Sequence, residues 1–401
     1  MTRRPSNDRN RLPHPVLALG AAIALAGCGE TADPNALSMV DSAGVAVVTA
    51  PRAVMEALPT WTTEPVLELG SADGPDAFGG VLGVHRYADG SVAVLDPMAR
   101  QVAWFAADGT PGARVGSEGD GPSEFRTPVR LDALPGDSLL VWDRSLNRVS
   151  VIGPDRTVAR TAPLTEVPTS GLYRGRLADG RLIFDVPDTD RPTATAPVMR
   201  DTRLRLHAPD GTVSTTLGPF PSVPWYRMGE DGYGTPVYAP ATDFAAAGDG
   251  IWVGPAASPE VVQVATDGTL RRIVRWGAPE RPVTQALRDR SLETALSRAN
   301  SDAERAEIRR LHEGLYFAPR LPFYRRVFTA ADGGLWVEGY NPDPSAEPTG
   351  WRVFDAEGRP LARLELPGSF RLWEAGSDHL AGTVSGDMEV PRVVIWRIVR
   401  S

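Results

Sequence analysis

The chain repeats one short pattern, and the first copy of that pattern lacks its beginning. Residues 66–78 read VLELGSADGPDAF, and residues 113–125 read ARVGSEGDGPSEF. Both segments run from an apolar stretch through Gly-Ser and Asp-Gly-Pro to a phenylalanine. Strand-like stretches precede the second copy, whereas no matching strands precede the first. We therefore expect residues 66–70 to be the last strand of a unit whose other strands lie elsewhere in the chain.

From residue 61 onward the complete unit can be followed along the sequence. It consists of two strands joined by a tight turn, a connection, and two further strands joined by a second tight turn. Asp-Gly between apolar runs predicts such turns, because a tight hairpin needs residues with positive φ. The first turns are expected at residues 89–90, 136–137, 179–180, 249–250, 332–333 and 377–378. The second turns are expected at residues 108–110, 155–157, 210–212, 267–269 and 357–359.

The sixth unit ends on its third strand, at residues 393–399. Residues 66–70 would supply its missing fourth strand and close the units into a ring, which leaves only short, protected sheet edges. Segments such as residues 116–125 resemble the blades of NHL-repeat and TolB-like proteins. The resemblance covers residues 61–401 and implies an all-β fold, a six-bladed β-propeller closed by an N-terminal strand.

One insertion is predicted to be a helical hairpin at residues 283–315. Leu287, Leu292 and Leu296 recur mostly at helical spacing in its first half. Ser301 followed by Glu304 forms a capping-box sequence at the start of a second helix. The hairpin is expected to pack against the rim of the sheets; the alternative is a role in binding a partner.

The first 27 residues have the pattern of a bacterial signal peptide. Four arginines precede a short apolar stretch at residues 16–26, which is too short to span a bilayer. The stretch ends in Leu-Ala-Gly-Cys at residues 25–28, which resembles the lipobox of bacterial lipoproteins and implies acylation of Cys28, the sole cysteine. The alternative is an ordinary secretory signal with a chance cysteine. Residues 28–60, rich in Ala, Pro, Ser and Thr, are expected to be a flexible tether with one short strand candidate at residues 45–48.

These features predict a monomer held in the cell envelope by its lipid, outside the cytoplasmic membrane, with Gly29 favouring the periplasmic side of the outer membrane. The whole chain has a formal net charge of −8, of which residues 1–27 contribute +3, so the remainder carries −11. Such a surface argues against nucleic acid as a partner. One cysteine also excludes an internal disulfide.

Strand order assigns the short turns to one face of the ring and every long connection to the opposite face. The long connections are residues 186–201, 218–239, 277–319 and 339–350. Loops of this length on a regular scaffold often carry function. Aromatic side chains favoured at binding surfaces lie in them: Trp225, Tyr226, Tyr233 and Tyr340. These side chains would either bind a ligand or pack the loops together.

Aligning the units on their first turns also predicts a ring of side chains at the mouth of a central channel, on the long-loop face. Six residues before each turn stand Gly83, Arg130, Tyr173, Asp243, Arg326 and Arg371. Arginine offers a bidentate fork, so the ring could bind a carboxylate or a phosphate. The alternative is an Arg–Asp network that ties the units together.

Signals for catalysis are weak. The sequence contains no Gly-x-Ser-x-Gly, His-Glu-x-x-His or phosphate-loop motif. His85, Asp132 and Asp243 are too few for a metal site, and the acidic loop with Glu118, Asp120 and Glu124 is a weak candidate for calcium. The leading hypothesis is therefore a non-enzymatic module without a cofactor that binds a protein, peptide or glycan through its long-loop face. The alternative is a hydrolase, lyase or sugar dehydrogenase with its site in the channel.

Overall fold

The structure is a computed structural model that describes residues 33–70, 77–165, 167, 171–229, 232–345, 347–385 and 390–400. The chain divides into two units, Met1–Pro34 and Asn35–Ser401, and the account below concerns the second. The predicted signal peptide and Cys28 lie outside the described residues.

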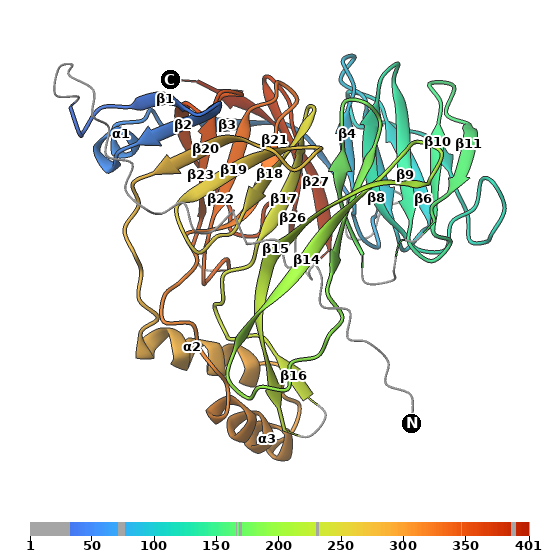
Figure 1. Cartoon of the computed structure of the whole chain (residues 1–401). Helices are drawn as coiled ribbons and strands as arrows, with labels where there is room; N and C mark the ends of the chain where they lie inside the picture. The colour runs from blue at the N-terminus through green and yellow to red at the C-terminus, as the bar shows by residue number, and fades with distance from the viewer. Residues whose placement is uncertain are drawn as a thin grey trace, which may run out of the picture. The chain divides into compact units, whose positions relative to one another are not determined.

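The second unit is mostly strands in four-stranded sheets, with few helices (Figure 1). The first sheet contains β4 (Val84–Arg86), β5 (Val92–Asp96), β6 (Gln101–Phe105) and β7 (Pro111–Val115). The second contains β8 (Pro128–Leu134), β9 (Ser138–Asp143), β10 (Arg148–Ile152) and β11 (Val158–Pro163). The third contains β12 (Leu172–Arg176), β13 (Leu182–Pro187), β14 (Val198–His207), β15 (Val213–Met228) and the short β16 (Gly232–Gly234).

The remaining strands follow the same antiparallel order. The fourth sheet contains β17 (Asp243–Ala247), β18 (Gly250–Gly254), β19 (Glu260–Ala265) and β20 (Leu270–Trp276). The fifth contains β21 (Tyr324–Thr329), β22 (Leu335–Gly339), β23 (Thr349–Phe354) and β24 (Pro360–Leu366). The last contains β25 (Arg371–Ala375), β26 (His379–Ser385), β27 (Pro391–Val399) and β3 (Thr62–Leu69).

Most of the predicted turns join the expected strands. Glycines at positive φ occupy the second turns at Gly109, Gly211, Gly268 and Gly358, where a side chain would be strained. One prediction is off by a residue: the turn between β17 and β18 uses Gly248 at φ +60° and Asp249, and Gly250 already belongs to β18.

The N-terminal strand pairs where the sequence predicts it. β3 runs antiparallel to β27, with Leu69 opposite Val393 and Glu68 opposite Val394. The strand is longer than the predicted residues 66–70, because it begins at Thr62. The last sheet therefore takes its outer strand from the opposite end of the chain.

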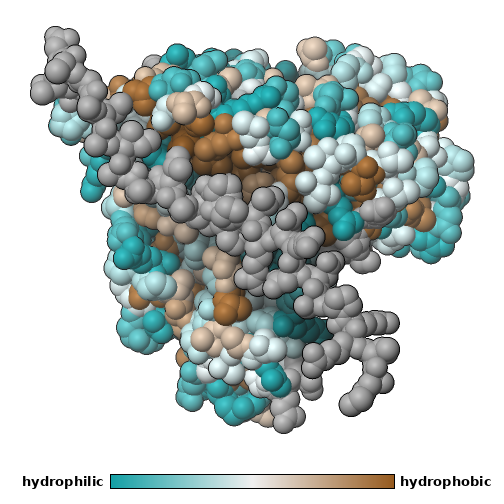
Figure 2. All heavy atoms as spheres, viewed as in Figure 1, coloured by the Kyte–Doolittle hydropathy of each residue, from teal (hydrophilic) through white to brown (hydrophobic). Residues whose placement is uncertain are grey.

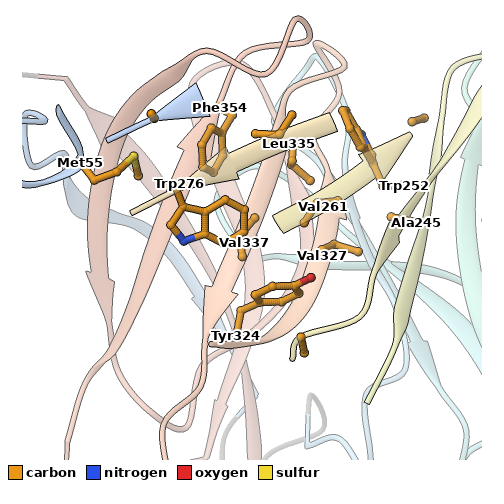
Figure 3. Close-up of a cluster of buried hydrophobic side chains, with 14 residues drawn as sticks. Met55, Ala245, Trp252, Val261, Trp276, Tyr324, Val327, Leu335, Val337 and Phe354 are labelled. Carbon is orange, nitrogen blue, oxygen red and sulfur yellow. The ribbon is translucent and has the colours of Figure 1, made fainter. Parts of the chain in front are cut away.

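The prediction of a flexible tether at residues 28–60 is wrong for residues 38–56, but the strand predicted at residues 45–48 is confirmed. β1 (Ser38–Ser42) and β2 (Val45–Ala50) form a hairpin, and β2 pairs parallel with β20 at the outer edge of the fourth sheet. The short helix α1 (Arg52–Glu56) follows and buries Met55. Figure 3 shows Met55 pointing toward Trp276 and Phe354 in the core between the fourth and fifth sheets. Val48, Ala50 and Met55 supply the buried apolar surface that orders this segment.

Buried apolar side chains form six clusters, and each is shared by two sheets. Five of the clusters join sheets that follow each other in the chain. The sixth joins the last sheet to the first, since Trp373, Val393 and Ile395 pack with Val84 and Val92. Both faces of every sheet are thus covered by a neighbour.

The helical hairpin is present as α2 (Gln285–Leu296) and α3 (Asp302–Glu313). Thr284 and Ser301 cap the two N-termini through their hydroxyl oxygens. Glu304 accepts a bond from the Asn300 N–H, one residue before the Ser301 N–H that a capping box uses. Neither helix buries a side chain, and the expectation that the pair packs on the sheet rim is wrong.

The helices are held by the other long connections instead. Tyr238 donates a hydrogen bond to the Leu287 carbonyl at 2.8 Å, and Arg290 pairs with Asp343 at 3.1 Å. Figure 1 shows α2 and α3 below the sheets, close to β16. Hydrophilic side chains are spread over the viewed face, with apolar groups gathered in places over the sheets (Figure 2). No helix of the described residues is long and apolar enough to cross a membrane.

Replacing Leu69 by alanine tests the pairing of β3 in the last sheet. Leu69 is 4% exposed and belongs to the cluster shared by the last and first sheets, so its loss should cost about 2–5 kcal/mol of unfolding free energy. Val66→Ala in the same strand is the matched control, because Val66 is 53% exposed. Chemical denaturation of the full chain measures both, and equal losses would contradict the pairing.

Candidate functional site

A cavity of about 900 Å³ runs between the first strands of all six sheets. Its wall takes side chains from β4, β8, β12, β17, β21 and β25. Five arginines and four carboxylates line it: Arg86, Arg130, Arg174, Arg176, Arg326, Asp132, Asp243, Glu374 and Asp378. We call this cavity the channel.

The channel reaches the surface on the side of the short turns. Ala88, Ala178, Gly248, Ala331 and Ser377 belong to its wall, and all five are exposed turn residues. None of the residues that line it belongs to the four long connections. The wall also reaches the opposite end of the strands, where the ring is predicted, because Asp243 is the first residue of β17 and Tyr173 the second of β12.

β-Bulges shape the channel wall. The pairing register shifts by one residue in four of the six lining strands: β8, β12, β21 and β25. A β-bulge places two residues of one strand opposite a single residue of the neighbouring strand, and it changes the direction in which the nearby side chains point. The bulged residue of β12 is Arg174, whose guanidinium thereby reaches both Asp185 and Asp243.

Four of the five predicted channel residues line the same cavity. Arg130 donates to Asp132 at 2.9 Å, and the Tyr173 hydroxyl donates to the other oxygen of Asp132. Burial raises the pKa of Tyr173, and the Asp132 carboxylate adds to that effect. The Asp132 carboxylate thus links β8 to β12 and keeps Tyr173 in its neutral form.

Asp243 has a structural part in this arrangement. It accepts a bond from Arg174 at 2.7 Å and one from the Val327 backbone N–H at 2.9 Å. These bonds link β17 to the strands on either side of it, β12 and β21. The Arg–Asp network that the sequence left as an alternative is present here.

Arg326 and Arg371 have no carboxylate in close contact among the described residues. Arg326 donates to the Leu372 carbonyl at a long 3.3 Å, and its nearest carboxylate, Glu338, lies 3.8 Å away. Arg371 stacks on Trp373 at 4.2 Å but is outside the residues that line the channel. Desolvation, followed by repulsion from Arg326, Arg130 and Arg325, lowers the pKa of Arg371 to about 10. The arginines from three sheets therefore lie close enough to repel one another.

A cluster of two histidines and two carboxylates at the turn end of the channel is not predicted from the sequence. Glu374 bonds His85 through one oxygen and His379 Nε2 through the other, the latter at 3.0 Å. Asp378 faces His379 Nδ1 at 2.9 Å. The sequence names His85 only in a set too small for a metal site, and no local pattern points to Glu374 or His379, because the register shift at Trp373 precedes Glu374 on β25.

The predicted loop-face residues lie in separate places. Trp225 is covered by Arg200 at 4.2 Å and contacts Tyr233, which in turn lies under Arg191 at 5.1 Å. This aromatic–arginine stack borders a pocket of about 370 Å³. Tyr226 is 2% exposed and packs against Tyr316, so for this residue the binding role is wrong and the alternative, packing of the loops, is the one the structure shows. Tyr340 lines another pocket, of about 260 Å³, beside Arg281 and Arg352.

The acidic loop provides no shared cation site. Glu118 pairs with Arg100, Asp120 pairs with Arg126, and Glu124 accepts the Gly121 N–H at 2.7 Å. Each carboxylate is thus engaged separately. Among the residues that the structure describes, no group of three His, Cys, Asp or Glu side chains is arranged to hold a metal ion.

Comparison with known proteins gives distant likenesses only. An exported protein of Bacteroides fragilis shares 11% identity over 88% of this chain and 99% of its own, with a TM-score of 0.47. A catalytically inactive virginiamycin B lyase of Staphylococcus aureus with quinupristin shares 11% identity over 83% and 99%, with a TM-score of 0.41. Regucalcin, a calcium-binding protein of Agrobacterium tumefaciens, shares 11% sequence identity over 86% of this chain and 97% of its own, with a TM-score of 0.40. No family model and no curated protein matches the chain.

The His379 contacts predict a pH-dependent stability. Burial opposes the charged imidazole, but hydrogen bonds to Glu374 and Asp378 outweigh it and raise the pKa of His379. A pKa that is higher in the folded protein than in the unfolded chain means that protonated His379 stabilises the fold. This stabilisation is complete below the pKa of the unfolded chain, about 6.5, and is lost as pH rises through the pKa of the folded protein. His379→Gln should therefore lower the unfolding free energy more at pH about 5.5 than at about 8.5. Denaturation at the two pH values checks this, and equal losses would refute it.

Proposed function

We propose that the protein is a membrane-anchored, extracytoplasmic binding module whose channel receives an anionic group, a carboxylate or phosphate carried by a peptide or glycan. The observation that carries this proposal is Arg326, which lines a large cavity without a close carboxylate partner. A partly buried guanidinium is costly unless it is paired, so a ligand anion would supply the missing partner.

The surroundings of Arg326 favour an anion. Arg130 lines the same cavity and Arg371 lies close to both, so the three positive charges converge from three sheets. An anion among them would relieve their mutual repulsion. Tyr173 adds an uncharged hydroxyl on the channel wall. The ligand would enter from the short-turn side, where exposed residues line the cavity.

The scaffold in this proposal is a closed six-bladed β-propeller of the NHL-repeat or TolB-like kind. The cluster shared by the last and first sheets and the pairing of β3 with β27 support closure. The Trp225–Tyr233 stack, with an arginine on each side, is proposed as a second contact for a protein or glycan on the long-loop side.

Binding of sulfate, an anion that keeps its charge across the working pH range, tests the channel. Arg326→Gln should weaken sulfate binding to the full-length chain about tenfold or more, because hydrogen bonds to charged groups contribute about 1.5–3 kcal/mol. Isothermal titration calorimetry in detergent measures the change. Arg160→Gln, on the exposed part of β11, is the matched control and should leave the affinity unchanged. An unchanged affinity in Arg326→Gln would overturn the channel site.

Fractionation of cells tests the membrane anchor. The proposed acylation of Cys28 places the wild-type chain in the membrane fraction, since buried acyl methylenes provide the attachment. Cys28→Ser should move most of the protein to the soluble extracytoplasmic fraction, whereas the neighbouring Gly29→Ala should not. Retention of Cys28→Ser in the membrane fraction would contradict a lipid anchor at that residue.

A further inference from the structure

Two histidines share one carboxylate at the turn end of the channel. His85 comes from β4, Glu374 from β25 and His379 from the start of β26, and all three line the cavity. Nδ1 of His85 and Nε2 of His379 each bond a different oxygen of Glu374. The carboxylate therefore fixes both rings relative to the channel.

The partners of each ring decide its protonation. Both nitrogens of His379 face carboxylates, Glu374 and Asp378, and each must carry a proton to donate, so the ring is held as the imidazolium. His85 has one carboxylate partner, and its Nε2 makes no hydrogen bond with any residue in the described ranges. The Nδ1–H tautomer of His85 satisfies Glu374 and leaves a lone pair on Nε2.

Neighbouring side chains hold the His85 ring in place and leave it open to the cavity. The His85 ring meets the Tyr87 ring edge-on at 4.6 Å, and the Tyr87 hydroxyl accepts a bond from Trp104 Nε1 at 3.1 Å. Arg86 is the nearby cation that opposes the charging of His379. The His85 side chain is 19% exposed, which leaves it reachable from the cavity.

We propose that His85 is a general base positioned by Glu374, and that the channel hydrolyses a carboxylic ester bearing an anionic group. The inference rests on the proposed anion site. Arg371 and Glu374 are three residues apart on β25, a separation of roughly 7–10 Å along the strand. If only a few bonds separate the anionic group of an ester from its carbonyl, binding of the anionic group among the arginines would place the carbonyl near His85.

The step needs only water as a second reactant. Nε2 of His85 takes a proton from water, the water oxygen bonds to the carbonyl carbon, and the carbonyl electron pair moves onto its oxygen. As the carbonyl re-forms, the bond to the alcohol oxygen breaks, and that oxygen takes the proton from His85. The products are the carboxylic acid and the alcohol. Glu374 balances the transient charge on His85, and His379 holds the other oxygen of Glu374.

The test uses para-nitrophenyl hydrogen glutarate, an activated ester with a free carboxylate, and the full-length chain in detergent. His85→Gln should slow release of para-nitrophenolate at least about 100-fold, in the range by which general bases accelerate reactions. His312→Gln on α3 is the matched control and should keep the wild-type rate. Wild-type hydrolysis no faster than that of His85→Gln overturns the proposal.

The role of Glu374 is tested by the pH profile. Glu374→Gln should lower kcat and change the pH profile of kcat/KM, because the carboxylate that bonds Nδ1 of His85 and balances the charge the ring gains in the reaction is removed. A profile identical to the wild type would show that Glu374 does not position the base. Nitrogen-15 NMR of the histidines gives an independent readout, and an Nε2–H tautomer of His85 at neutral pH would overturn the assignment.

Sulfate binding separates this inference from the proposed function. His85→Gln should keep the wild-type sulfate affinity, since the arginines are unchanged. Sulfate binding without ester hydrolysis overturns the general base and leaves the binding module standing. Absence of both overturns both.

Discussion

Every sheet in this protein has two apolar faces, and each face is buried only by the next sheet. Burial of such surface is worth about 25 cal/mol per Å², and it is the main favourable term in folding. The last sheet meets this requirement by packing on the first through Trp373 and Val393. A chain that reaches its sixth sheet with one strand short must take that strand from elsewhere. β3 supplies this strand by pairing with β27, and this pairing fixes the position of the N-terminal segment that precedes β3.

The channel lies where the packed sheets come together at their first strands. Where the first strands of the sheets converge, charged side chains are withdrawn from bulk water, and burying them is costly unless they are paired. Most are paired across sheets: Asp132 joins β8 to β12, Asp243 joins β12, β17 and β21, and Glu374 joins β25 to β4. In the described residues no bond of this kind joins β4 to β8. The backbone just before β4 is instead packed closely on β8, because a Cβ added to Gly83 would lie 2.4 Å from the Leu131 side chain. Arg326 lies beside these paired groups, and its nearest carboxylate, Glu338, is 3.8 Å away.

The strands and turns were predictable because they depend on local rules. Asp-Gly turns, apolar runs and a capping box each act over a few residues, and the missing fourth strand follows from counting units. The ring of Arg130, Tyr173, Asp243 and Arg326 was found by alignment for the same reason. Two features depend on contacts distant in sequence and were missed. The bulge at Trp373 brings Glu374 to His85 and His379, and the fit of Met55 beside Trp276 orders a segment whose composition is that of a tether.

The N-terminal segment also has a mechanical consequence. Residues 45–69 run along the outside of three consecutive sheets: β2 lies on β20, Thr60 bridges to Arg363 of the fifth sheet, and β3 completes the last. A pull on the start of this unit therefore loads β1 and β2 before it reaches β3. In a molecule pulled from this end, the pairing of β2 with β20 in the fourth sheet would carry the force. The pairing of β3 with β27 would carry none until β2 had separated from β20.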